Sequence, residues 1–229
     1  MDQQEPEVLV RLREMILQGK LPPGRRIPEA EIAEMLGISR TPVRQALPVL
    51  AKEGLLTPAG ARGFAVRAFT VAEIEEGVDL RGTLEGFAAR KLAERGASAA
   101  VLAELRAILA EGDAIFAKGA LVEADEEAYG AMNGRFHAAV VEASGVTVVR
   151  DLLQTVNRIP FTAPATIAFD RLDLGQMFEV LRYAHQQHHA IVEAVVYREG
   201  ARAEALFREH VNAQKRSMNL RPPPPAAGG

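Results

Sequence analysis

Apolar side chains in the first fifty residues recur at the three- and four-residue spacing of amphipathic helices. In the first such segment they are Val8, Leu12, Met15 and Ile16. After a break at "PPGRRI", the second segment has Ile32, Met35 and Leu36, and Gly37 ends it. The third segment has Val43, Leu47 and Leu50. The pattern predicts three helices, with the last two separated by a short turn.

The start of the third helix carries its own signals. Ser39 can accept a hydrogen bond from the free N–H groups of the first turn, and Pro42 fits that turn because its missing N–H costs nothing there. Helix, short turn with glycine and capped helix is the helix-turn-helix arrangement. The alternating "ARGFAVRAF" that follows predicts a strand, and with "LLTP" it makes a β wing.

From Thr70 onward nearly every pattern is helical. Thr70 with Glu73 forms a capping-box pattern, Ser98 is placed as an N-cap, and Gly145 as a C-cap. The fold class is therefore mainly α: an N-terminal winged helix-turn-helix domain with a small β wing in 1–69, and an all-α bundle in 70–220. The tail 221–229, "RPPPPAAGG", cannot continue a helix and is expected to be disordered.

Composition excludes several classes of protein. The 229 residues include no cysteine, so a disulfide scaffold, a thiolate metal site and a cysteine nucleophile are ruled out. No apolar run approaches the roughly 18–20 residues that span a bilayer. The acidic N-terminus "MDQQEPEVLV" lacks the apolar core of a signal peptide. We therefore expect a cytoplasmic protein with no membrane partner.

Charge is divided unevenly along the chain, although the net charge is only −3. Residues 1–68 hold ten Lys and Arg against eight Asp and Glu, and residues 20–67 hold eight against four. A local basic surface on an acidic protein can bind DNA, but the same counts also fit scattered surface charge.

Two arginines make the DNA interpretation specific. Arg40 and Arg44 lie four residues apart, so both project from one face at the start of the third helix, which enters the major groove in such motifs. Arginine there can bind guanine or phosphate. Arg62 lies at a glycine-flanked wing tip, from which it could enter the minor groove. The alternative is an amphipathic helix hairpin with solvated arginines.

Residues 8–67 resemble the GntR-type winged-helix domain, through "LPPGRRIPEAEIAEMLGISRTPVRQALPVLAKEGLL" and the wing "ARGFAV". The resemblance implies a set of residues that contact DNA: Ser39, Arg40, Thr41, Arg44, Arg62 and Gly63. Two positions depart from the family pattern. Ala30 replaces an arginine that contacts DNA, and Pro48 interrupts the recognition helix, where it is expected to bend the helix or end it early. Both departures affect which operator sequence is recognised, and not whether the domain binds DNA.

The five histidines all lie in the helical half, and helices of a bundle can direct side chains at one central point. His137 shares a face with Asn133, while His188 and His210 lie on apolar stripes and are expected to face inward. Periodicity also allows His185 or His189 to face inward. Any single histidine can also be a buried or surface residue with no ligand.

Residues 71–215 resemble the FadR-type C-terminal domain, called FCD, through "LRGTLEGFAARKLAERGA", "AMNGRFHAAVVEASG" and "HHAIVEAVVYREGARAEALFREH". The resemblance implies a divalent metal, Zn²⁺ or Ni²⁺, held by Asn133, His137, His188 and His210. Asn133 replaces the family's aspartate, which leaves the cation's charge unneutralised and favours a bound carboxylate. Arg81, four residues before Glu85, either forms a helix ion pair or reaches the effector. Histidines that bind the ligand directly, without metal, are the alternative.

Together these features predict a homodimeric transcriptional regulator, and specifically a repressor. It binds an inverted-repeat operator and responds to a small organic acid in a metal-containing helical domain. A regulator for which the metal is the signal is one rival. A metal-dependent enzyme is the other, although no nucleophile or poised carboxylate base accompanies the histidines, so we expect no enzymatic activity.

Overall fold

The structure is a computed structural model that describes residues 4–17, 19–60, 63–159, 161–165 and 173–218. The chain divides into two units, one of Met1–Ile74 with Asn157–Thr162 and one of Glu75–Val156 with Ala163–Gly229. The tail expected to be disordered, 221–229, lies outside the described residues.

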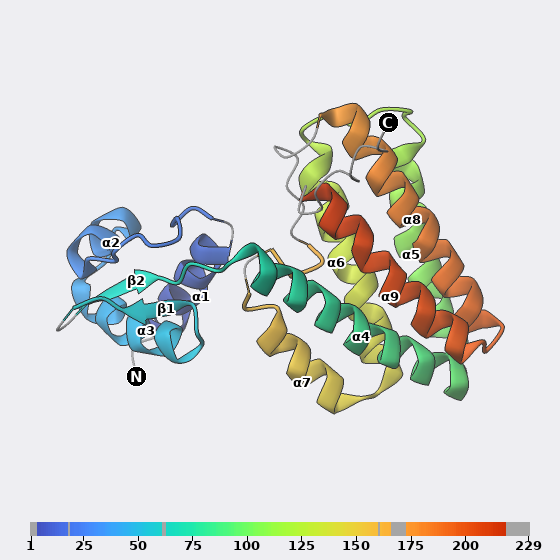
Figure 1. Cartoon of the computed structure of the whole chain (residues 1–229), viewed down its shortest axis with the longest axis horizontal. Coiled ribbons are helices and arrows are strands. Elements are labelled where there is room, and N and C mark those ends of the chain that lie inside the picture. Colours follow the sequence, from blue (N-terminus) through green and yellow to red (C-terminus); the bar gives the residue numbers. More distant parts are fainter. Residues whose placement is uncertain (1–3, 18, 61–62, 160, 166–172, 219–229) are drawn as a thin grey trace, which may run out of the picture. The chain divides into compact units, whose positions relative to one another are not determined.

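The first unit contains three helices and a two-stranded hairpin (Figure 1). They are α1 (Gln4–Leu17), α2 (Glu29–Leu36), α3 (Arg40–Lys52), β1 (Leu56–Pro58) and β2 (Phe64–Val66). Gly37 ends α2 in the left-handed conformation, with φ 68°, and so turns the chain into α3. The strands pair antiparallel with Leu56 opposite Val66. This is the predicted winged helix-turn-helix fold.

Apolar residues of all five elements form the core of this unit. Val8, Leu12 and Ile16 of α1 pack in one cluster with Val43, Leu47 and Leu50 of α3 and with Val66 of β2. In α2, Ile32 and Ala33 face the core, whereas Met35 of the same apolar pattern is 47% exposed.

Pro48 does not end α3 early, which was one of the two effects expected from the sequence. The helix continues to Lys52 with Pro48 inside it. Pro48 lies on the exposed side, whereas Leu47 and Leu50 beside it are buried in the core. Burial of these two side chains favours the helical path on both sides of the proline and offsets the lost backbone hydrogen bond.

The second unit is a helical bundle (Figure 1). Its helices are α4 (Val71–Arg95), α5 (Ala99–Phe116), α6 (Asp125–Ser144), α7 (Thr147–Val156), α8 (Leu174–Val196) and α9 (Gly200–Ser217). The predicted caps are confirmed. Thr70 and Glu73 exchange hydrogen bonds, Ser98 accepts from the Val101 N–H, and Gly145 ends α6 with φ 66°.

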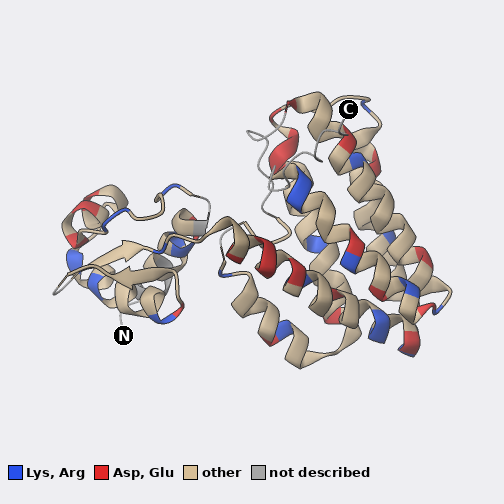
Figure 2. Ribbon diagram, in the orientation of Figure 1, with Lys and Arg blue, Asp and Glu red and all other residues tan. Residues whose placement is uncertain are grey.

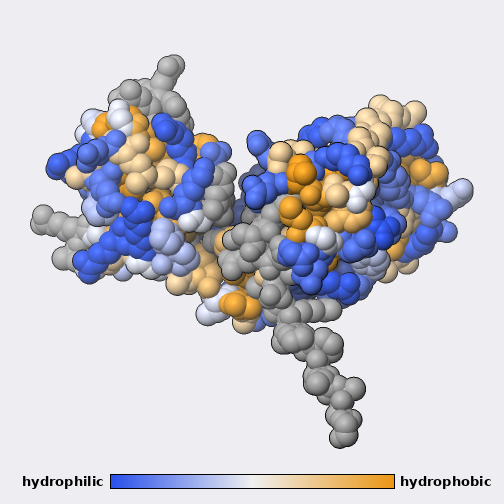
Figure 3. All heavy atoms as spheres, turned by 90° about the horizontal axis from the view of Figure 1, so that it is seen from above, coloured by the Kyte–Doolittle hydropathy of each residue, from blue (hydrophilic) through white to orange (hydrophobic). Residues whose placement is uncertain are grey.

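The core of the bundle lies between α4, α5, α6, α8 and α9, and a smaller cluster packs α7 against α4 and α6 through Val149, Leu153, Ala88 and Val141. The surface seen in Figure 3 is largely hydrophilic, with small apolar patches. Several polar residues are nevertheless buried inside this otherwise apolar core. They include Arg81, Glu85, Asn133, His137, His188 and His210.

Candidate functional site

The exposed start of α3 carries the residues predicted to contact DNA. Ser39 occupies the N-cap position with extended backbone angles, but its hydroxyl makes no capping hydrogen bond, contrary to expectation. The first-turn N–H groups therefore remain available to an acceptor such as phosphate. Arg40, Thr41 and Arg44 are all exposed, and Figure 2 shows basic residues at this end of α3.

Arg44 is held by a residue that the sequence did not identify. Glu29, at the start of α2, accepts from Arg44 Nε at 2.9 and 3.1 Å and lies 2.8 Å from Arg44 Nη2. These hydrogen bonds lower the pKa of Glu29, so the pair is ionic at neutral pH. The contact orients the guanidinium, and a phosphate or base must share or replace it.

The predicted wing contact is described only in part. Gly63 begins the return of the wing, and its carbonyl accepts from the Ala59 N–H at 2.8 Å. A side chain at Gly63 would come within 3.0 Å of the Ala59 carbonyl, so the tight hairpin favours glycine. Arg62 lies outside the described residues.

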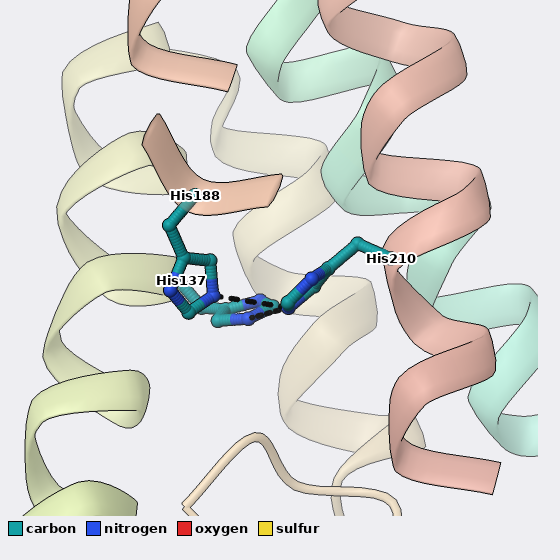
Figure 4. Close-up of side chains that lie close together, drawn as sticks. All are labelled: His137, His188 and His210. Atoms are coloured by element: carbon teal, nitrogen blue, oxygen red, sulfur yellow. Dashed lines mark hydrogen bonds between the residues drawn. The ribbon is translucent and has the colours of Figure 1, made fainter. Parts of the chain in front are cut away.

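Three predicted metal ligands meet inside the helical unit, each on a different helix (Figure 4). Nε2 of His210 on α9 lies 3.2 Å from Nε2 of His137 on α6 and 3.0 Å from Nε2 of His188 on α8. All three rings are buried. Phe136 packs against His188 with a ring-centroid distance of 4.2 Å, so the apolar neighbours fix the ring positions.

On two of the three rings, the second nitrogen lies near an oxygen atom. His137 Nδ1 lies 2.9 Å from Oε2 of Glu85, and His210 Nδ1 lies 3.2 Å from the amide oxygen of Gln187. Since these oxygens can only accept, the single proton of each neutral ring belongs on Nδ1. The Nε2 atoms of His137 and His210 then present lone pairs to each other across 3.2 Å, an arrangement that a cation between them would stabilise.

The surroundings of these histidines disfavour a proton as the cation between the two Nε2 atoms. Burial lowers the pKa of His188 well below its usual value, and the neighbouring His210 and His137 lower it further. Burial and His137 likewise lower the pKa of His210. Burial alone would raise the pKa of Glu85, but His137 and Arg81 outweigh it and keep this carboxylate ionised.

The remaining predicted residues line one small pocket, which also borders His210. They are Asn133 and Arg81, joined by Tyr129 and Gln214. Asn133 donates from Nδ2 to the Pro164 carbonyl at 2.6 Å, while its buried Oδ1 has no hydrogen-bond partner among the described residues. Arg81 Nε also lies 3.4 Å from Glu85 Oε2, so Arg81 both borders the pocket and pairs within α4.

Close packing between α4 and α9 positions Arg81 near His210. A side chain at Gly82 would place its Cβ 2.7 Å from Cγ1 of Val211. Glycine at this position therefore allows α9 to lie against α4 immediately beside Arg81 and His210. The positive charge of Arg81 is close enough to lower the pKa of His210, although less than burial and His137 do.

The donor set fits a divalent transition metal. Imidazole nitrogens about 2.0–2.1 Å from one ion, at angles of about 90–110°, lie about 2.9–3.4 Å apart, which includes both observed separations. A carboxylate on the second nitrogen, as Glu85 is for His137, orients a metal-binding histidine and raises its basicity. Imidazole suits Zn²⁺ and Ni²⁺, and the orphaned Asn133 oxygen is available beside the pocket.

His185 and His189 do not join this cluster. Both contact Asp113 of α5, a residue that sequence reasoning did not identify. Gln187, which contacts His210, was missed as well, because its position beside His188 on α8 gave no distinct signal.

Comparisons with known proteins match both units. Residues 76–213 match the family described as FCD domain, and residues 5–66 match Bacterial regulatory proteins, gntR family. The chain belongs to the GntR family of bacterial regulators. The Nta operon transcriptional regulator of Aminobacter aminovorans is 32% identical over 82% of this chain and 82% of its own length.

A second relative of this GntR protein is the probable D-xylose utilization operon transcriptional repressor of Paenarthrobacter nicotinovorans, 32% identical over 86% of this chain and 81% of its own. The solved structure titled E. coli McbR/YncC superposes with a TM-score of 0.70 at 25% identity, covering 93% of this chain and 95% of the other. The protein is thus a DNA-binding transcriptional regulator and not an enzyme. None of the described helices is long and apolar enough to cross a membrane.

Proposed function

We propose that this GntR protein is a homodimeric repressor whose operator affinity is set by a small organic acid bound beside a divalent metal. Asn133, His137, His188 and His210 would hold the metal, which when bound supplies positive charge and open coordination positions for a carboxylate. The observation that carries the proposal is the convergence of three buried Nε2 atoms, two of them with Nδ1 facing an acceptor.

The polar residues of the pocket support an anionic effector. Arg81 supplies a buried guanidinium next to His210, and Tyr129 and Gln214 line the same wall. The pocket volume is about 20 Å³, which holds about one water, so an acid requires the helices around it to move. A ligand that binds the opened bundle more tightly than the closed one shifts the population between them.

Operator binding supports the proposal of a dimer. Arg40 and Arg44 belong to one recognition helix, and a single such helix reads only a few base pairs. Two-fold protein symmetry then matches an inverted repeat, with half-sites about 34–36 Å apart or a multiple of this. Effector binding would act by changing the relative placement of the two DNA-binding units.

The experiment measures operator affinity of the full-length dimer at fixed salt, with acetate, succinate and citrate as probes. In metal-loaded protein, at least one acid should change operator affinity, and both EDTA and His188→Ala should abolish the response. Gln186→Ala, an exposed position on the same helix, is the control and should respond like wild type. A response to acid that survives EDTA and His188→Ala would show that the acid acts without the metal.

A regulator for which the metal itself is the signal is the second candidate. The small volume of the pocket favours it, since an ion needs no such opening. Titration of metal-free protein with Zn²⁺ or Ni²⁺ alone separates the two. A change in operator affinity with metal, and none with the acids, identifies the metal as the signal.

A further inference from the structure

A second group of metal-ligating side chains lies between α5 and α8, separate from the three-histidine cluster. Nε2 of His185 and Nε2 of His189 lie 3.0 and 2.9 Å from the same oxygen, Oδ1 of Asp113. One ligand atom of each residue lies within 4.8 Å of the others. From this geometry we propose a second divalent-cation site formed by Asp113, His185 and His189, a site that the proposed function does not use.

The register of the two helices brings these ligands together. His185 and His189 are one turn apart on α8, so both rings project from the same face toward α5. Asp113 lies in the last turn of α5 and faces them. Two imidazoles and a carboxylate form a donor set that binds Zn²⁺ and similar ions and leaves the remaining positions to water.

The ring of His185 is seated in a space made for it. A side chain at Gly112 would place its Cβ only 2.2 Å from Cε1 of His185, so glycine at this position lets the imidazole lie against α5. Phe116 stacks on the same ring, with centroids 5.4 Å apart and planes at 29°. These contacts hold Nε2 toward Asp113, which reduces the entropy cost of assembling a coordination shell.

A neutral His185 is incompletely satisfied without a cation. Its Nδ1 is buried and makes no hydrogen bond of good geometry among the described residues. With its proton on Nε2 the ring donates to Asp113 but leaves Nδ1 unsatisfied, and with its proton on Nδ1 the Nε2 lone pair faces a carboxylate. A metal ion on Nε2 resolves the second arrangement.

The site is open to ions from solution. Asp113 and His189 have side chains 56% and 45% exposed, whereas that of His185 is 4% exposed. One buried and two accessible ligands allow an ion to enter without opening the core. Bound there, it would join the end of α5 to the middle of α8 and so stabilise the bundle that also carries the three-histidine cluster.

The test is the metal content and melting temperature of full-length protein equilibrated with a small excess of Zn²⁺ and then desalted. Wild type should retain two ions per chain, and His189→Ala and Asp113→Ala one each, because both changes remove a ligand at an exposed position that the fold does not need. Gln186→Ala should retain two. Zn²⁺ should also raise the melting temperature of wild type more than that of His189→Ala.

The two sites are told apart by a second variant. His188→Ala should lose the inner ion and keep the outer one, and the double variant His188→Ala/His189→Ala should keep none. If the inner site fails to bind metal, wild type retains one ion that His189→Ala removes, and the outer site stands. If His189→Ala and Asp113→Ala retain as much Zn²⁺ as wild type, and Zn²⁺ raises all melting temperatures equally, the second site is wrong.

Discussion

Replacing Asn133 by aspartate tests the role of this residue, because the substitution should have opposite effects without metal and with metal. In metal-free protein, Asn133→Asp removes the hydrogen bond from Nδ2 to the Pro164 carbonyl and places an acceptor at that 2.6 Å contact. With metal present, the same carboxylate becomes a charged ligand. We therefore expect the variant to be less stable than wild type without metal and to bind metal more tightly.

The size of both effects follows from the contacts. Leaving a buried carbonyl without its donor costs about 1–3 kcal/mol, and in a domain of this size each 1 kcal/mol lowers the melting temperature by about 2–4 °C. Without metal, the melting temperature should fall by about 2–12 °C. A full charge about 4 Å from an ion gains about 4 kcal/mol per unit charge near a protein surface, less the cost of desolvating the carboxylate. Metal affinity should therefore rise at least about tenfold.

Differential scanning fluorimetry with EDTA and with Zn²⁺ measures the first effect, and a competition titration against a chromophoric chelator measures the second. Gln186→Glu, which adds the same charge at an exposed position of α8, controls for net charge. If Asn133→Asp leaves both metal affinity and metal-free stability at wild-type values, Asn133 is not a ligand position and its free oxygen has another role.

Three further predictions concern the DNA-binding unit and assembly. Arg40→Ala and Arg44→Ala should each weaken operator binding by about 1–3 kcal/mol in gel-shift assays at matched salt; wild-type binding by both variants would refute the recognition-helix assignment, and Arg182→Ala on α8 is the control. Arg13 donates to Glu53 at 2.7 and 2.9 Å and these hydrogen bonds lower the pKa of Glu53, so Glu53→Gln should lower the free energy of unfolding by about 0.5–1 kcal/mol at pH 7. Because a lowered carboxyl pKa stabilises the fold only above the unfolded value, about 4.3, the difference from wild type should shrink as the pH falls below that value, and a difference that is unchanged at low pH would contradict the assignment. Light scattering should show a dimer at micromolar concentration, and a monomer that binds full operator with one DNA-binding unit would contradict the symmetric arrangement.

Local signals predicted the helices and most of the caps because they act over a few residues, although Ser39 makes no capping hydrogen bond. The capping box of Thr70 and Glu73, the Ser98 cap and the glycine end of α6 depend on neighbours within one turn. The exposure of Met35 and the continuation of α3 past Pro48 were not predictable from the local sequence, because burial is decided by the partner element. A short α2 can turn only part of its apolar stripe to the core, and α3 is held on its buried face by α1.

The functional residues were predictable only where two of them lie on the same face of one helix. His137 and Asn133 share a face of α6, but the contacts that orient the site join residues far apart in sequence. Glu85 on α4 meets His137 on α6, and Asp113 on α5 meets two histidines of α8. No periodicity within one helix indicates which partner lies opposite, so Glu29, Glu85 and Asp113 acquired their roles only from the tertiary structure.

Anomalous diffraction from crystals grown with Zn²⁺, and separately with Ni²⁺, tests the central claim most directly. We expect an anomalous peak between the rings of His137, His188 and His210, about 2.0–2.1 Å from each Nε2 atom and absent from crystals of His188→Ala. Metal-supplemented crystals in which the three Nε2 atoms keep their present separations, with no anomalous peak between them, would contradict it.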